Sequence, residues 1–129
     1  MARNTPQRAG DVLAFTVTPS VTIIQGELVL LEAGLATHTP SATAIAIGRA
    51  EQGVTAGPSG SDPVVVPVRR GIFRWDNDTA EPVTAASVGG PCYVKDSRTV
   101  TADDEAGPPL IVVAVEADGV WAFSTTFSF

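Results

Sequence analysis

Hydrophobic and polar residues alternate along much of the chain, which is the pattern of β-strands. In residues 11–18, Leu13, Phe15 and Val17 occupy every second position. Residues 27–31 (ELVLL) form a short continuous apolar run instead. Segments of this kind recur at intervals of roughly ten residues and predict about eight short strands.

The middle of the chain carries two apolar segments that are close together in sequence. Residues 64–69 (VVVPVR) and 71–75 (GIFRW) predict one strand that is bent or bulged near Gly71. Pro67 lacks an amide hydrogen and cannot donate to a strand ladder, so we expect this strand at an edge or bulge.

The remaining local signals concern turns. Asp118-Gly119 separates two β-rich runs in PLIVVAVEADGVWAFSTTF, which predicts a hairpin. Residues 82–90 can hold one helical turn, with Thr84 as N-cap and Gly89 closing it. Ten prolines interrupt any longer helix. The fold class is therefore all-β, a compact sandwich or barrel with at most one short helix.

The first nine residues differ from the rest of the chain. Residues 1–9 are polar, lack periodicity and carry Arg3 and Arg8 without an acid, so they predict an extended arm. Residues 10–129 are predicted to form a single β domain, since a chain of 129 residues favours one domain. That domain carries six basic and fourteen acidic side chains, and the whole chain has a net charge of −6. This balance argues against a general nucleic-acid binder.

Other features bear on the cellular compartment. The first ten residues lack the apolar core of a signal peptide, and no apolar run approaches the ~18 residues of a membrane span, so we expect no membrane partner. Cys92 is the single cysteine, so no intrachain disulfide is possible, which fits folding in a reducing cytosol.

Candidate catalytic residues are few. His38 is the only histidine and lies in the polar stretch THTPSAT, without a nucleophile-elbow motif, so we favour an exposed loop histidine over a catalytic one. Cys92 lies in an apolar run, which favours a core position over a reactive thiol. One Cys and one His cannot supply a zinc site, and we expect no metal or other cofactor.

Three polar segments resemble ligand loops only in part. Asp76, Asn77 and Asp78 start like a calcium loop, but the pattern then fails, which favours acidic residues that end a strand in a polar turn. A second acidic segment is interpreted as a solvated turn: Asp103, Asp104 and Glu105. A glycine-rich segment has no following Lys-Ser or Lys-Thr pair, so it predicts a flexible hairpin loop rather than a phosphate cradle: Gly53, Gly57 and Gly60.

Two clusters are candidates for contact surfaces. The first is a set of three arginines within six positions, for which pairing with surface acids is at least as good an interpretation as binding: Arg69, Arg70 and Arg74. The second is an aromatic row at alternate positions, for which core packing is the default and burial against another subunit the alternative: Trp121, Phe123, Phe127 and Phe129.

The segment TAASVGGPCYVKDSRTVT (84–101) resembles a stretch of the small bacteriophage capsid decoration proteins, also called cement proteins. The shared features are a Thr-Ala start, a Val-Gly step, an aromatic-containing strand, an acidic residue and a Thr-Val pair. They correspond to Thr84, Ala85, Val88, Gly89, Tyr93, Asp96, Thr99 and Val100. The ending VVAVEADGVWAF is similar to the closing hairpin of that family. The segment from GVTAG to VVVPVRRGIF is similar to its small loop and following apolar strand. The resemblance covers residues 10–124.

The resemblance implies a protein without enzymatic activity or cofactor. Members of the family are usually trimers that are made in the host cytoplasm and brace the outer face of the phage head. The partners would be the major capsid protein and further copies of the chain. Candidate capsid contacts are Arg3, Thr5, Pro6, Arg8, Arg69, Arg70 and Arg74, and candidate subunit contacts are the four aromatic residues from Trp121 to Phe129. Two alternatives are another virion component, such as a tail or fibre-base module, and a small β-barrel ligand-binding domain.

Overall fold

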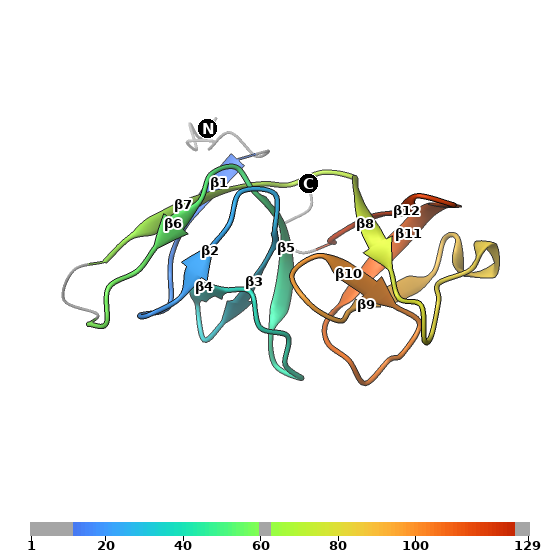
Figure 1. Ribbon diagram of the computed structural model, residues 1–129, viewed down its shortest axis with the longest axis horizontal. Helices are drawn as coiled ribbons and strands as arrows, with labels where there is room; N and C mark the ends of the chain where they lie inside the picture. Colours follow the sequence, from blue (N-terminus) through green and yellow to red (C-terminus); the bar gives the residue numbers. More distant parts are fainter. Residues whose placement is uncertain (1–11, 60–62, 126–129) are drawn as a thin grey trace, which may run out of the picture.

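The computed structural model describes residues 12–59 and 63–125, and this part of the chain is nearly all β (Figure 1). One short 3-10 turn, η1, covers Ala85–Ser87. The strands are β1 (Val12–Thr16), β2 (Thr22–Ile23), β3 (Leu28–Glu32), β4 (Leu35–Thr37), β5 (Ile45–Ala50), β6 (Val54–Thr55), β7 (Val65–Arg69), β8 (Phe73–Asn77), β9 (Pro91–Val94), β10 (Thr99–Thr101), β11 (Pro109–Glu116) and β12 (Gly119–Phe123).

The strands form two bodies that lie side by side (Figure 1). The first is a five-stranded antiparallel sheet in the order β1-β7-β5-β3-β4, and a parallel bridge between Val17 and Ala36 joins its two ends. The small β2-β6 pair belongs to the same half of the chain. The second body is a closed barrel in the order β10-β8-β12-β11-β9, in which only the β10-β8 pair is parallel.

The predicted all-β class is confirmed. The described residues contain more strands than the about eight that the sequence predicts. The difference comes from very short strands, because β2 and β6 have two residues each and β4 and β10 have three. Pairs of two or three residues leave almost no periodic signal in a sequence.

Strand β3 explains the continuous apolar run at residues 27–31. Its successive side chains point to opposite faces, and each face lies against a different hydrophobic core. Leu28 and Leu30 pack in the core of the barrel, whereas Val29 and Leu31 pack in the core of the first sheet. All four are buried, so both faces of β3 are covered over residues 28–31 and each of these positions requires an apolar residue.

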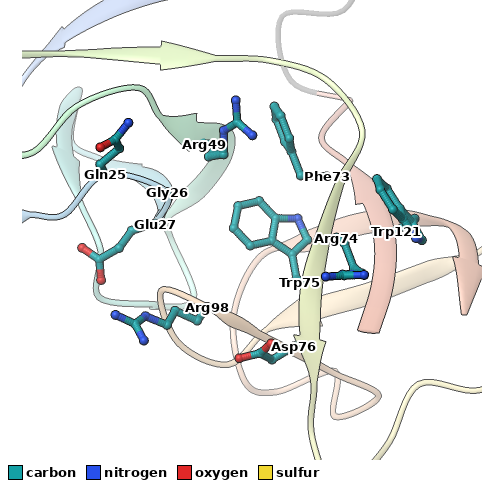
Figure 2. Close-up of a pocket in the computed structure, with 10 residues that line it drawn as sticks. All are labelled: Gln25, Gly26, Glu27, Arg49, Phe73, Arg74, Trp75, Asp76, Arg98 and Trp121. Carbon is teal, nitrogen blue, oxygen red and sulfur yellow. The ribbon is translucent and has the colours of Figure 1, made fainter. Parts of the chain in front are cut away.

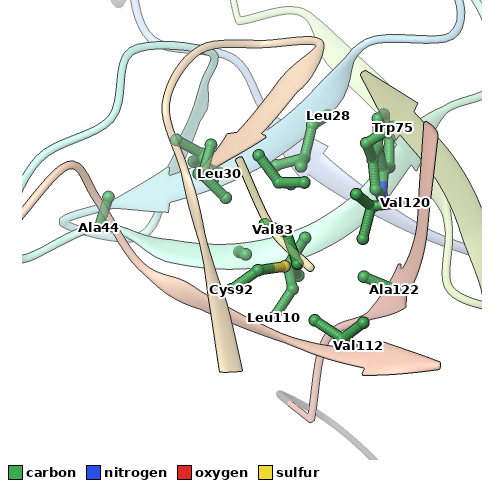
Figure 3. Packing of buried hydrophobic residues seen from close by; sticks show 13 residues of the cluster. Leu28, Leu30, Ala44, Trp75, Val83, Cys92, Leu110, Val112, Val120 and Ala122 are labelled. Carbon is green, nitrogen blue, oxygen red and sulfur yellow. The ribbon is translucent and has the colours of Figure 1, made fainter. Parts of the chain in front are cut away.

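The barrel core is therefore built from both bodies (Figure 3). The first sheet contributes Leu28 and Leu30 from β3, Ala46 from β5 and Ala44 from the segment before β5. The barrel contributes Trp75, Val83, Cys92, Val94, Val100, Leu110, Val112, Val120 and Ala122. The two bodies thus share a packed interface that is continuous with the barrel interior.

The prediction of one bent strand across Gly71 is wrong. Strand β7 pairs with β1 and β5 in the first sheet, and β8 pairs with β10 and β12 in the barrel, so the chain crosses between the bodies at residues 70–72 (Figure 1). Pro67 is also not on an edge strand. Its carbonyl accepts a hydrogen bond from the Glu51 amide, just beyond the end of β5. The ring nitrogen faces that same side, so its missing hydrogen falls just beyond the last pair of the β5-β7 ladder, Ala50 and Val68.

The two predicted turns are present. Strands β11 and β12 form an antiparallel hairpin in which Glu116 pairs with Gly119. Thr84 occupies the N-cap position of η1, although its side chain makes no capping hydrogen bond. Gly89 follows with φ of +88°, a left-handed conformation that favours glycine.

Candidate functional site

A groove of about 540 Å³ lies where the first sheet meets the barrel (Figure 2). Its lining combines arginines, aromatic rings and two acids: Gln25, Gly26, Glu27, Arg49, Phe73, Arg74, Trp75, Asp76, Arg98 and Trp121. Five segments of the sequence supply these residues, namely the β2–β3 turn, the end of β5, strand β8, the β9–β10 turn and strand β12.

Strand β8 supplies the floor of the groove. Its Trp75 ring projects toward the β2–β3 turn, with Arg49 on one side and Arg98 on the other (Figure 2). Trp75 is largely buried in the barrel core and meets Phe73 edge to face, with ring centroids 6.0 Å apart. Trp121 on β12 lies directly opposite Arg74 of β8. The aromatic surface is thus held by packing before any ligand arrives.

Arg49 is oriented from two sides. Its guanidinium lies 4.4 Å from the centre of the Phe73 ring, a cation–π contact, and its Nη2 atom is 3.4 Å from Glu51 Oε1. The same carboxylate oxygen accepts a bond from Arg69 Nε at 2.5 Å. Partial burial opposes ionisation of Glu51, but hydrogen bonds and charge from Arg69 and Arg49 outweigh it and lower its pKa.

The other two arginines of the groove have a weak ion pair or none. Arg74 Nη1 is 3.6 Å from Asp118 Oδ2, and both side chains are about half or more exposed, so this pair is weak. Arg98 makes no ion pair within residues 12–59 and 63–125, and it is exposed at the groove edge. Both guanidinium groups can therefore bind an anionic group at little cost.

The carboxylate of Glu27, in contrast, already accepts hydrogen bonds within the chain. The donors are the Ile24 amide, at 2.7 Å, and Ser97 Oγ, at 2.5 Å. The neighbouring Leu28 amide donates to the Ser97 carbonyl, which ties the β2–β3 turn to the β9–β10 turn of the barrel. Glu27 therefore fixes one wall of the groove in place.

The structure places His38 beside this carboxylate. His38 Nδ1 lies 3.8 Å from Glu27 Oε2, and the imidazole is about one-third exposed, so it is a half-buried rather than a fully exposed loop histidine. Glu27 lies between His38 and Ser97, whereas a hydrolase triad places the histidine between serine and acid. The arrangement does not suit nucleophilic catalysis.

Cys92 is a core residue, as predicted. It is fully buried in the barrel core, and this burial raises the pKa of its thiol to about 11. A neutral thiol without solvent contact is a weak nucleophile.

The Asp76-Asn77-Asp78 segment ends strand β8 as predicted, but Asp78 is not solvated. Its carboxylate is buried and binds Lys95 Nζ at 2.8 Å and Thr101 Oγ1 at 2.9 Å. The Asn77 side chain exchanges two hydrogen bonds with the backbone of Val83 and closes the turn. These contacts make the segment a structural clamp.

The other two predicted loops are only partly as expected. Asp104 and Glu105 are exposed in a turn, and the Asp103 carboxylate accepts a bond from the Glu105 amide. The glycine-rich segment contains strand β6, which begins just after Gly53 and pairs with β2 through Val54 and Thr55. Gly57 lies in the loop that follows, and Gly60 is outside the described residues.

The three arginines that are neighbours in sequence do not form one cluster in the structure. Only Arg74 of that set lines the groove, whereas Arg69 pairs with Glu51 and Arg70 is half-buried at the start of the crossing segment. Trp121 and Phe123 share the outer face of β12, opposite the buried Val120 and Ala122, so core packing is wrong for these two rings. Several further candidates lie outside the described residues: Arg3, Thr5, Pro6, Arg8, Phe127 and Phe129.

Sequence reasoning missed most of the groove. Arg49, Arg98 and the β2–β3 turn reach it from segments distant in sequence, which no local pattern indicates. Phe73 and Trp75 were missed although they flank Arg74 on β8, where the alternation in FRWDN was the one available signal.

Residues 12–59 and 63–125 contain no group of three or more His, Cys, Asp or Glu side chains that could hold a metal ion, and no helix with the length and apolarity to span a membrane. Comparisons with protein-family models, with curated proteins and with solved structures found no match to this chain.

Proposed function

We propose that this chain is a non-enzymatic structural protein that binds the outer surface of a bacteriophage capsid lattice and stabilises it. The observation that carries the proposal is the lining of the groove. Arginine, tryptophan and phenylalanine are enriched at the centres of protein–protein interfaces, where they supply much of the binding energy. A preformed groove with this lining suits a protein whose function is contact.

The exposed apolar side chains support the same proposal. Seven large ones lie on the described surface: Val12, Ile24, Ile45, Val65, Ile72, Val88 and Val113. Val12 and Val65 belong to the outer face of the β1-β7 ribbon, together with the paired residues Ala14 and Pro67. Single exposed apolar residues are normal, but this face combines them with Thr16 and Arg69 across two paired strands, a mixed surface that a partner can cover.

The mechanism would be stabilisation by mass action. A protein that binds only the assembled lattice stabilises that lattice, as any ligand stabilises the state it binds. Contacts repeated over the shell add through multivalency. The arm with Arg3 and Arg8 would contribute an additional anchor, and Phe123 with the other aromatic candidates would join three copies.

The test uses heads assembled from the major capsid protein of the phage that encodes this chain. We expect the purified protein to sediment with expanded heads, to saturate at a fixed ratio to the capsid protein, and to raise the temperature at which the heads open. Absence of co-sedimentation together with an unchanged opening temperature would reject the proposal. For the oligomer, light scattering should give three times the 13.3 kDa of one chain.

A further inference from the structure

The charges of the groove differ from those of the whole molecule. The chain has a net charge of −6, yet three of its eight basic side chains line this one groove: Arg49, Arg74 and Arg98. The lining also holds two acids, Glu27 and Asp76, so its charged side chains carry a net charge of +1. Arg49 and Arg74 face Glu51 and Asp118 outside the lining, which leaves Arg98 as the groove guanidinium without an ion pair among the described residues.

The geometry points to an occupant that combines carboxylates with apolar side chains. A guanidinium binds a carboxylate through two parallel hydrogen bonds, and Arg98 and Arg74 are the groups available for this. The rings of Phe73, Trp75 and Trp121 offer apolar surface between them. We infer that the groove binds an extended acidic segment of another protein, in which carboxylate and apolar side chains alternate.

A polypeptide fits these observations better than a nucleic acid. A phosphate backbone is bound by a continuous track of cations, whereas this groove offers three arginines, two of which already face acids. A peptide needs only one or two carboxylates in register and gains further from apolar contacts. The volume of about 540 Å³ lies within the roughly 300–1,000 Å³ of ligand pockets in proteins.

The inference rests on the proposed function only for the owner of the segment, which would then be the capsid protein. The chemistry of the groove follows from this chain alone. Peptide binding in the groove and capsid binding by the chain can therefore fail separately, and the two are measured separately.

The chain provides its own reporter. Its only two tryptophans, Trp75 and Trp121, both line the groove, so intrinsic fluorescence follows groove occupancy. We would titrate the full chain with an acetylated peptide of sequence Gly-Glu-Val-Glu-Leu-Glu-Gly, with the same peptide carrying glutamine for each glutamate, and with a ten-nucleotide thymidine oligomer. The expected result is a saturable fluorescence change with the glutamate peptide, at least tenfold weaker binding of the glutamine peptide, and no binding of the oligonucleotide.

The variant Arg98→Gln tests the cation directly. The guanidinium of Arg98 makes no ion pair among the described residues, so its replacement should leave the fold intact. We expect about tenfold weaker binding of the glutamate peptide, the loss typical of one charge-assisted bond. Ala86→Glu is the matched control: it changes the net charge equally, at an exposed site on η1 outside the groove lining, and should bind within twofold of the parent.

Four outcomes would overturn the inference: no fluorescence change with the glutamate peptide, equal affinity for the glutamine peptide, an equal loss in Ala86→Glu, or tighter binding of the oligonucleotide. Peptide binding by a protein that does not bind heads would reject the proposed function and support this inference. Unchanged head binding by Arg98→Gln would reject the capsid protein as owner of the segment.

Discussion

Strand β3 allows a direct test of whether the two bodies fold as one unit. Leu30 and Val29 are adjacent and both fully buried, but Leu30 faces the barrel core and Val29 faces the core of the first sheet. Truncating each to alanine therefore weakens a different core from neighbouring positions on one strand. The two variants differ in little else.

The magnitudes follow from burial. A fully buried leucine that becomes alanine costs about 2–5 kcal/mol of unfolding free energy, because the lost transfer energy adds to the cavity left behind. Valine loses two methyl groups and should cost roughly 1–3 kcal/mol. A loss of about 3 kcal/mol lowers the Tm of a domain of this size by roughly 10 °C.

We expect a single transition in both variants. The barrel core includes Leu28, Leu30, Ala44 and Ala46 from the first half of the chain, so the barrel cannot keep its interior once the first sheet unfolds. Trp75 and Trp121 lie on β8 and β12, so their fluorescence reports the barrel and its contact with the first sheet. Far-ultraviolet circular dichroism reports strands of both.

The assay is urea unfolding followed by both signals. The two midpoints should coincide in the parent protein, in Leu30→Ala and in Val29→Ala. If Val29→Ala lowers the circular dichroism midpoint and leaves the fluorescence midpoint unchanged, the barrel folds independently. That result would refute both the shared-core reasoning and the prediction of a single β domain over residues 10–129.

Three further predictions concern single positions. Hydrogen bonding from Lys95 outweighs burial and lowers the pKa of Asp78 to about 2, so its carboxylate stabilises the fold above pH ~4 and this stabilisation is lost as the pH falls through 2. The Tm of Asp78→Asn should therefore lie well below that of the parent at pH 6 and close to it at pH 2. Burial raises the pKa of Cys92 from 9.0 to about 11, so Ellman's reagent at pH 8 should react at least about a hundredfold more slowly with native than with urea-unfolded protein. A Cβ at Gly48 would overlap a backbone carbonyl of β7, so Gly48→Ala should cost about 1–3 kcal/mol in urea unfolding, whereas Gly57→Ala, with open space around it, should not.

The parts of the fold that follow from the sequence are the local ones. The β11–β12 hairpin could be predicted because Asp118-Gly119 and the flanking apolar runs lie within one short segment. The helical turn at Ala85–Ser87 could likewise be placed from Thr84 before it and Gly89 after it, although the Thr84 side chain makes no capping hydrogen bond. These signals act over a few residues and need no knowledge of the partners.

The pairing of distant strands was not predictable in the same way. Residues 64–75 contain one apolar pattern, yet β7 joins the first sheet and β8 joins the barrel. The deciding contacts lie elsewhere, since β8 pairs with β10 and β12, more than twenty residues further along the chain. Nothing within the segment itself distinguishes one bent strand from two strands in different bodies.

The arginines illustrate what this means for a functional site. Arg69, Arg70 and Arg74 are neighbours in sequence, and each is directed by the body it belongs to rather than by its neighbours. The crossing after β7 leaves Arg69 with Glu51 in the first sheet and carries Arg74 to the barrel, beside the groove that Arg49 and Arg98 reach from other segments. In a protein of short strands, a charge cluster is created by the same long-range pairing that sets the topology. A cluster along the chain is therefore weak evidence for a binding surface, and the groove between the bodies is the stronger candidate.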